Sequence, residues 1–227
     1  MSVEKWSIPV NFLTYGFPLL WVAKSAEQQR KESGVERYYS DHELSQLGLG
    51  GFGRNVRLDR STIIVNPAGL CIGDNTRIDA FCLISAAGPG VSIGSNVHIG
   101  AGTYIFGGGG VTIEDFAAVS VRCAIFSTND DFSGEYMIGP AVPSRFRNVT
   151  AAPVRVARHA AIGAGSVVLP GVTFGEGSAA GALSLVTQNV NPFTMVLSGS
   201  ARAVKPRSRR LLELEAEMLR CQQEQSA

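Results

Sequence analysis

A polar segment with several carboxylates interrupts an otherwise apolar repeat between about residues 126 and 152. It contains Asp130, Asp131 and Glu135, followed by Arg145 and Arg147. Polar residues gathered in one excursion from a regular framework are typical of a functional loop, although a purely solvated loop has the same composition. An ordinary aspartate has a pKa of about 3.9 and is a weak base. Two adjacent, partly buried carboxylates raise one of the two pKa values, so Asp130 is a candidate general base.

The three histidines are the other candidate bases, and they are scattered along the chain at His42, His98 and His159. His98 precedes an aliphatic residue that we expect to point inward, so we expect His98 at an outward corner with a structural or subunit-contact role. His159 is expected at an outward turn. Histidines this far apart do not match a zinc-ligand pattern, so we expect no metal and no carbonic-anhydrase-type activity.

The framework around these residues is a six-residue repeat. It is clearest near the C-terminal end, where the inward positions are Val156, Ile162, Val168, Phe174, Ala180 and Val186. Upstream blocks follow the same spacing through Leu58, Ile64, Ile72, Ile78, Ile84, Ile93, Ile99, Ile105, Ile113, Val119 and Ile125. The phase slips fall at turn-forming residues, namely Pro67–Gly69, Gly88–Gly90 and Gly107–Gly110.

A period of six distinguishes this chain from the common fold classes. A helix repeats its apolar face at about 3.6 residues, and a simple hairpin sandwich alternates at about two. A short strand followed by a turn, repeated, gives six. We therefore predict an all-β solenoid in which aliphatic side chains stack from one coil to the next.

The repeat resembles that of the hexapeptide-repeat acyltransferases over about Tyr38 to Arg207. The run from Asn96 to Tyr104 resembles a coil of the bacterial galactoside and maltose acetyltransferases, and residues 152–172 resemble their C-terminal coils. Residues 127–136 resemble a subgroup linked to surface-polysaccharide sugars. The resemblance implies a left-handed parallel β-helix, three hexads to a triangular coil, and a homotrimer with active sites between subunits.

The resemblance also implies an activity, the transfer of acetyl from acetyl-CoA to a sugar by direct attack on the thioester. The resemblance points to a sugar of surface-polysaccharide (O-antigen or capsule) biosynthesis and leaves open whether that sugar is free, nucleotide-linked or lipid-linked. The histidine that most relatives use as general base falls on Asp130 here, beside Asp131. A neutral amine needs less help from a base than a hydroxyl does, so O- and N-acetylation both remain open. A non-catalytic β-helix scaffold or binding protein is the alternative.

Further site residues are implied position by position. The catalytic group would comprise Asp130, Asp131 and His159, and the acceptor would meet Tyr104, Asn129 and Glu135. The residues implied for acetyl-CoA are Ala164 and Ala182 at the pantetheine arm, Thr187 and Gln188 near the adenosine, and Arg202 and Lys205 at the phosphates. Arginine suits the last role because its planar fork matches phosphate oxygens.

Three regions are expected: an N-terminal, partly helical extension over 1–50, a β-helix domain over 51–205, and a C-terminal α-helix over 206–227. The apolar segment 10–23 is short for a membrane span of about 20 residues. We expect it to pack as a helix on the body or a neighbouring subunit, with weak membrane-surface contact or a retained signal sequence as the alternatives. Leucines at helical spacing after Pro206 predict an amphipathic helix that covers the open end of the coils or joins the trimer contacts.

The net charge limits the classes of binding partner, and the cysteine content indicates the cellular compartment. The formal net charge is +1, so no global field favours nucleic acid. The 4 cysteines form no CxxC pair, which favours a reducing cytoplasm.

Overall fold

The computed structural model describes residues 36–197 and four residues further on, Glu213, Glu217, Arg220 and Cys221, which are helical. The predictions for segment 10–23, for Arg202 and Lys205, and for most of the C-terminal helix lie outside the described residues. No helix among the described residues is long and apolar enough to cross a membrane.

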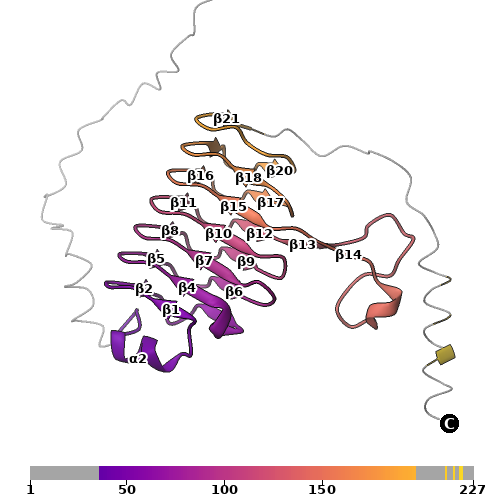
Figure 1. Ribbon diagram of the computed structural model, residues 1–227, viewed down its shortest axis with the longest axis horizontal. Helices are drawn as coiled ribbons and strands as arrows, with labels where there is room; N and C mark the ends of the chain where they lie inside the picture. Colours follow the sequence, from indigo (N-terminus) through magenta and orange to yellow (C-terminus); the bar gives the residue numbers. More distant parts are fainter. Residues whose placement is uncertain (1–35, 198–212, 214–216, 218–219, 222–227) are drawn as a thin grey trace, which may run out of the picture. The chain divides into compact units, whose positions relative to one another are not determined.

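Short parallel strands wind into a left-handed β-helix with three sheets, which confirms the solenoid predicted from the hexads and the coil implied by the family resemblance (Figure 1). The first sheet contains β1 (Gly51–Phe52), β4 (Leu70–Ile72), β7 (Val91–Ile93), β10 (Val111–Ile113), β15 (Val154–Val156) and β18 (Thr173–Phe174). The second contains β2 (Arg57–Leu58), β5 (Arg77–Ile78), β8 (His98–Ile99), β11 (Ala118–Val119), β16 (Ala161–Ile162), β19 (Ala179–Ala180) and β21 (Met195–Val196). The third contains β3 (Ile63–Val65), β6 (Leu83–Ser85), β9 (Tyr104–Phe106), β12 (Ala124–Phe126), β17 (Val167–Val168) and β20 (Leu185–Val186).

The core is a set of aliphatic ladders along the helix axis. In the second sheet Ile78 pairs with Leu58 on one side and with Ile99 on the other, and all three are fully buried. Each buried aliphatic side chain contributes about 1.5–3 kcal/mol relative to exposure. The small residues four places after the inward positions, such as Ala160 and Ser166, are buried as well. The burial of these side chains confirms the inward positions predicted from the six-residue repeat.

The phase slips lie at the corner between the third and first sheets. Pro67–Gly69 forms the short 3₁₀ helix η1 there, and Gly90 and Gly110 adopt φ values of +89° and +92°. Extra residues at this corner lengthen a turn without moving the inward side chains, so the coil stack stays in register.

A short helix begins the described chain. Helix α2 (Asp41–Gln46) starts with a capping box, in which the Ser40 hydroxyl accepts from the Glu43 backbone N–H and the Glu43 carboxylate accepts from the Ser40 backbone N–H. Leu44 of α2 is fully buried in the same core as Leu58. The apolar core thus begins within residues 36–50, which we had predicted to belong to the extension.

The longest excursion leaves the coil after β12. It forms the antiparallel pair β13 (Thr128–Asp130) and β14 (Val149–Ala151), with the 3₁₀ turn η2 (Ser144–Phe146) between them. Figure 1 shows this hairpin projecting from the side of the coil stack. It coincides with the predicted polar loop.

Candidate active site

The base of the projecting loop is anchored by Ser127, a fully buried serine at the corner after β12. Its hydroxyl donates to the Phe106 carbonyl at 2.6 Å and accepts from the Gly109 backbone N–H at 2.8 Å. A Cβ at Gly109 would lie 2.3 Å from the Ser127 carbonyl oxygen and 2.9 Å from the Ala152 nitrogen. The glycine run of 107–110 therefore leaves room for the two strands of the loop itself.

The two neighbouring aspartates of the loop are held differently. Asp131 Oδ1 accepts from the Ser133 backbone N–H at 2.7 Å, and Oδ2 accepts from Asn148 Nδ2 at 3.1 Å. Asp130 ends β13 and is half-buried, and its carboxylate has no hydrogen-bond partner within the described part of the chain. Asp131 therefore shapes the loop, while the carboxylate of Asp130 remains available to a ligand.

The residues expected to meet the acceptor lie on the loop and on the sheet from which it departs. Asn129 pairs with Thr150 in the hairpin. Glu135 is exposed in the loop, and its backbone N–H donates to Ser133 Oγ at 3.1 Å. Tyr104 is on the outer face of the third sheet, 47% exposed, and pairs with Ala124 of β12.

His159 lies at a different corner from the loop. It occupies the turn between β15 and β16, where the first sheet meets the second, with φ of +59°. Its ring stacks on Phe116 with centroids 5.1 Å apart, and its Nε2 accepts from Arg158 Nε at 3.3 Å. The outward turn position is as predicted, but one chain does not bring His159 to Asp130, because the loop departs between the third and first sheets.

Ala164 and Ala182 occupy stacked turns between the second and third sheets. The Ala164 carbonyl accepts from the Leu183 backbone N–H at 2.8 Å. Among the described residues, neither the Ala164 nor the Ala182 backbone N–H has a partner. A Cβ on the preceding Gly163 would lie 2.5 Å from the Ala182 nitrogen, so glycine is required for the turns to stack this closely. The result is an exposed edge with free backbone donors.

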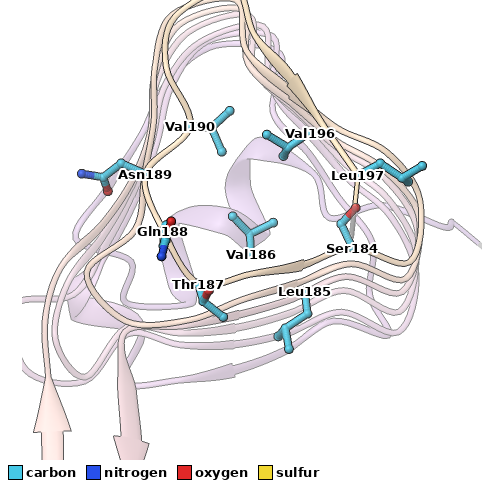
Figure 2. Close-up of a pocket in the computed structure, with 9 residues that line it drawn as sticks. All are labelled: Ser184, Leu185, Val186, Thr187, Gln188, Asn189, Val190, Val196 and Leu197. Carbon is cyan, nitrogen blue, oxygen red and sulfur yellow. The ribbon is translucent and has the colours of Figure 1, made fainter. Parts of the chain in front are cut away.

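Thr187 and Gln188 line a cavity of about 220 Å³ in the last coil. Figure 2 shows Val186, Val190 and Val196 projecting into its centre, so the cavity is the end of the apolar core. Thr187 and Gln188 themselves are exposed at its rim.

The sequence interpretation missed a cluster of charged residues on the second sheet, centred on Asp79. Arg57, Arg77 and His98 follow one another in register on its outer face. The signal was present, because each of them directly precedes an inward aliphatic residue of the repeat.

Comparisons with known proteins agree with this architecture, although no protein-family model matches the chain. The chain is 39% identical over 179 residues to the dTDP-4-amino-4,6-dideoxy-D-glucose acyltransferase of Escherichia coli, which covers 79% of this chain and 93% of that protein. A putative acetyltransferase of Staphylococcus aureus is 28% identical over 118 residues, covering 51% of this chain and 54% of that protein.

Solved structures of AntD, an N-acyltransferase from Bacillus cereus, are similar to this chain in both sequence and fold. The complex of AntD with dTDP and 3-hydroxybutyryl-CoA has a TM-score of 0.70 and 37% identity, covering 83% of this chain and 100% of that one. Another AntD structure, with one serine substituted, contains dTDP-4-amino-4,6-dideoxyglucose and coenzyme A, at 37% identity and a TM-score of 0.70, over 82% of this chain and 99% of that one.

Proposed function

The chain belongs to the hexapeptide-repeat acyltransferases, and from that premise we propose that it acetylates the 4-amino group of a dTDP-linked 4-amino-4,6-dideoxy sugar, with acetyl-CoA as donor. The observation that carries this function is the 39% identity to the E. coli acyltransferase over 93% of its length. The AntD complexes, which hold CoA thioester and dTDP or dTDP-sugar, support the same pair of substrates. The chain is a CoA-dependent sugar acyltransferase, and a non-catalytic scaffold is no longer a competing function.

An amine acceptor explains why a carboxylate can stand where most relatives have histidine. The neutral amine attacks the thioester carbon, a C–N bond forms, the C–S bond breaks, and the proton lost by the nitrogen ends on the CoA sulfur. Asp130 would accept a hydrogen bond from the amine, orient it and carry that proton. AntD has been solved with substitutions at a serine and at an aspartate ten residues later, and Ser120 and Asp130 have the same spacing here.

The donor would lie along the stacked turns between the second and third sheets. The free backbone N–H groups of Ala164 and Ala182 suit the amide carbonyls of a pantetheine arm. This placement brings the adenosine toward Thr187 and Gln188 and leaves the phosphates to Arg202 and Lys205. The four free cysteines fit a cytoplasmic enzyme, where nucleotide sugars and CoA thioesters are both present.

A homotrimer is supported by the outer face of the third sheet. Ile63 and Leu185, on the two outermost strands, are 59% and 54% exposed there. The rings of Phe106 and Phe126, on two strands between them, stack with centroids 5.1 Å apart. An apolar strip that runs the length of a sheet is typical of a covered surface. We propose that a second copy covers it.

The substitution Asp130→Asn tests the proposed function. Thiol release with acetyl-CoA and dTDP-4-amino-4,6-dideoxyglucose should fall about 100-fold, the lower end for loss of a general base, because an amine needs less assistance. The KM for acetyl-CoA should stay unchanged. Asp41→Asn, at an exposed aspartate of α2, is the matched control. Unchanged turnover in Asp130→Asn would remove Asp130 from the reaction.

A further inference from the structure

Two buried carboxylates hold three basic side chains on the outer face of the second sheet, near the N-terminal coils. Arg37 Nε donates to Asp59 Oδ2 at 2.7 Å, and Arg77 Nε donates to Asp79 Oδ1 at 2.7 Å. His98 Nε2 lies 2.8 Å from Asp79 Oδ2. Asp59 and Asp79 are only 4% and 7% exposed, whereas the three basic side chains are about half-exposed. The two guanidinium groups and the imidazole are therefore held in place by buried carboxylates and remain open to solvent.

The basic residues also form a column. Arg57 pairs with Arg77, and Arg77 pairs with His98, so three chargeable groups occupy consecutive strands about 4.8 Å apart. Like charges directly opposite each other destabilise a sheet. Asp79 offsets part of that repulsion, but no carboxylate in the described part of the chain pairs with Arg57. In a chain of net charge +1 this column is a local concentration of positive charge.

The donors in this column are suited to a phosphate group. A guanidinium carries five N–H donors, and Asp79 takes only the Nε donor of Arg77 within hydrogen-bond distance. Within the described part of the chain, no hydrogen bond engages the terminal donors of Arg77 or the side-chain donors of Arg57, so these donors can serve a ligand. Arginine forks held by a second interaction are preorganised for a multiply charged oxyanion.

The position of the basic column along the coils indicates which of the two phosphate-bearing substrates, the nucleotide-linked sugar or coenzyme A, it would bind. In each coil, one residue follows the inward aliphatic side chain of the second sheet. These residues stack from coil to coil in the order Asp79, Gly100, Ser120. Ser120 is thus two coils, or about 10 Å, from Asp79, roughly the span of one sugar ring and its attached phosphate. Ala164 and Ala182, expected at the donor, lie on the opposite side of Ser120, toward the C-terminal coils.

We propose that Arg57, Arg77 and His98, with Arg37 beside them, bind the diphosphate of the nucleotide-linked acceptor. The inference rests on the proposed function, since it takes the acceptor to be a nucleoside diphosphate sugar. Acceptor and donor then share one track along the second sheet, with the diphosphate at the N-terminal coils, the reacting amine near Ser120, and CoA at the C-terminal coils. Asp130 would reach this amine from the loop of a neighbouring copy, because the loop of the same chain departs from the corner between the third and first sheets.

Calorimetric titration of the full chain with dTDP, thymidine and coenzyme A tests this assignment. Arg57→Gln and Arg77→Gln should each weaken dTDP binding by about tenfold or more, the effect expected for a lost hydrogen bond to a charged group. Neither should change the affinity for thymidine or coenzyme A. Arg54→Gln is the matched control, because Arg54 also pairs with an aspartate, at 3.0 Å, but lies at the corner between the first and second sheets. Arg57→Gln decides the matter if Arg77→Gln, which loosens a buried carboxylate, does not fold.

Three outcomes overturn the assignment, and a fourth separates it from the proposed function. Unchanged dTDP binding in both variants, or no dTDP binding by the wild type at millimolar ligand, removes the diphosphate site. If the variants bind coenzyme A more weakly and dTDP unchanged, the basic column binds the phosphates of the donor instead. If the variants lose dTDP but the wild type transfers no acetyl to the dTDP-amino sugar, the diphosphate site stands and the proposed acceptor amine fails.

Discussion

The substitution Asp131→Ala tests how the loop that presents Asp130 is held in place. It removes two acceptor atoms, one bonded to the Ser133 backbone N–H at 2.7 Å and one bonded to Asn148 Nδ2 at 3.1 Å. These bonds tie the start of the loop to the residue just before β14. Without them the loop is still joined to itself by backbone contacts: the three residue pairs of β13 and β14, the bond from the Asp131 N–H to the Asn148 carbonyl at 3.0 Å, and the bridge between Met137 and Arg147.

The expected size of the effect follows from these contacts. A hydrogen bond to a charged group contributes about 1.5–3 kcal/mol, and Asp131 is only half-buried, so we take about 1–3 kcal/mol for the pair of bonds. Since about 1.4 kcal/mol is a factor of ten, the population of the ordered loop falls by about 5- to 140-fold at most. kcat/KM for the acceptor should fall by up to that factor, whereas the affinity for coenzyme A should not change.

The variant Asp131→Asn separates a structural role from a chemical one. Its amide oxygen still accepts from the Ser133 backbone N–H, but its amide nitrogen cannot accept from Asn148 Nδ2. One of the two bonds is therefore kept, and kcat/KM should fall by only about 2- to 12-fold if Asp131 only shapes the loop. The melting temperature should be the same in both variants, because stability in a solenoid comes from contacts between neighbouring coils. If Asp131→Asn is as slow as Asp131→Ala, Asp131 takes part in the chemistry and our interpretation is wrong.

Three further predictions concern the coils. Ile78→Ala should lower the free energy of unfolding by about 2–5 kcal/mol in urea titrations, because Ile78 is fully buried between Leu58 and Ile99 of its ladder. Burial raises the pKa of the Cys82 and Cys123 thiols, so mass mapping after brief alkylation should find label on exposed Cys71 and none on these two until the chain unfolds. The Ser40 backbone N–H, with Arg60 and the Ser40 hydroxyl, lowers the pKa of Glu43 to about 2. The stabilisation by Glu43 is therefore complete above about pH 4.5 and lost as pH falls toward 2, so the melting temperatures of wild type and Glu43→Ala should converge below pH 3.

The sequence was sufficient to predict the coils because one physical quantity, burial, decides the inward positions. A hexad that places Ile78, Ile99 and Val119 inside leaves no other register in which all three avoid water. The same spacing located the loop, since polar residues at 126–152 could not continue the ladder. The corner turns followed from glycine and proline at the phase slips.

The contacts within the site could not be predicted in the same way. Asp131 and Asn148 are 17 residues apart in an irregular segment, where no periodicity says which side chains meet. The charged column required the register of the sheets, because Arg57 and Arg77 are 20 residues apart and adjacent only once the coil length is known. His159 was correctly expected at an outward turn, but which corner faces the loop depends on how copies of the chain assemble.

The most direct test of the enzyme's function is the identity of its product. Purified protein is incubated with acetyl-CoA and dTDP-4-amino-4,6-dideoxyglucose, and the nucleotide sugar is analysed by mass spectrometry and NMR while free CoA is titrated. We expect one acetyl group on the sugar nitrogen for each CoA released. Release of CoA with the acetyl group on a hydroxyl, or no transfer to this sugar at saturating substrates, would contradict it.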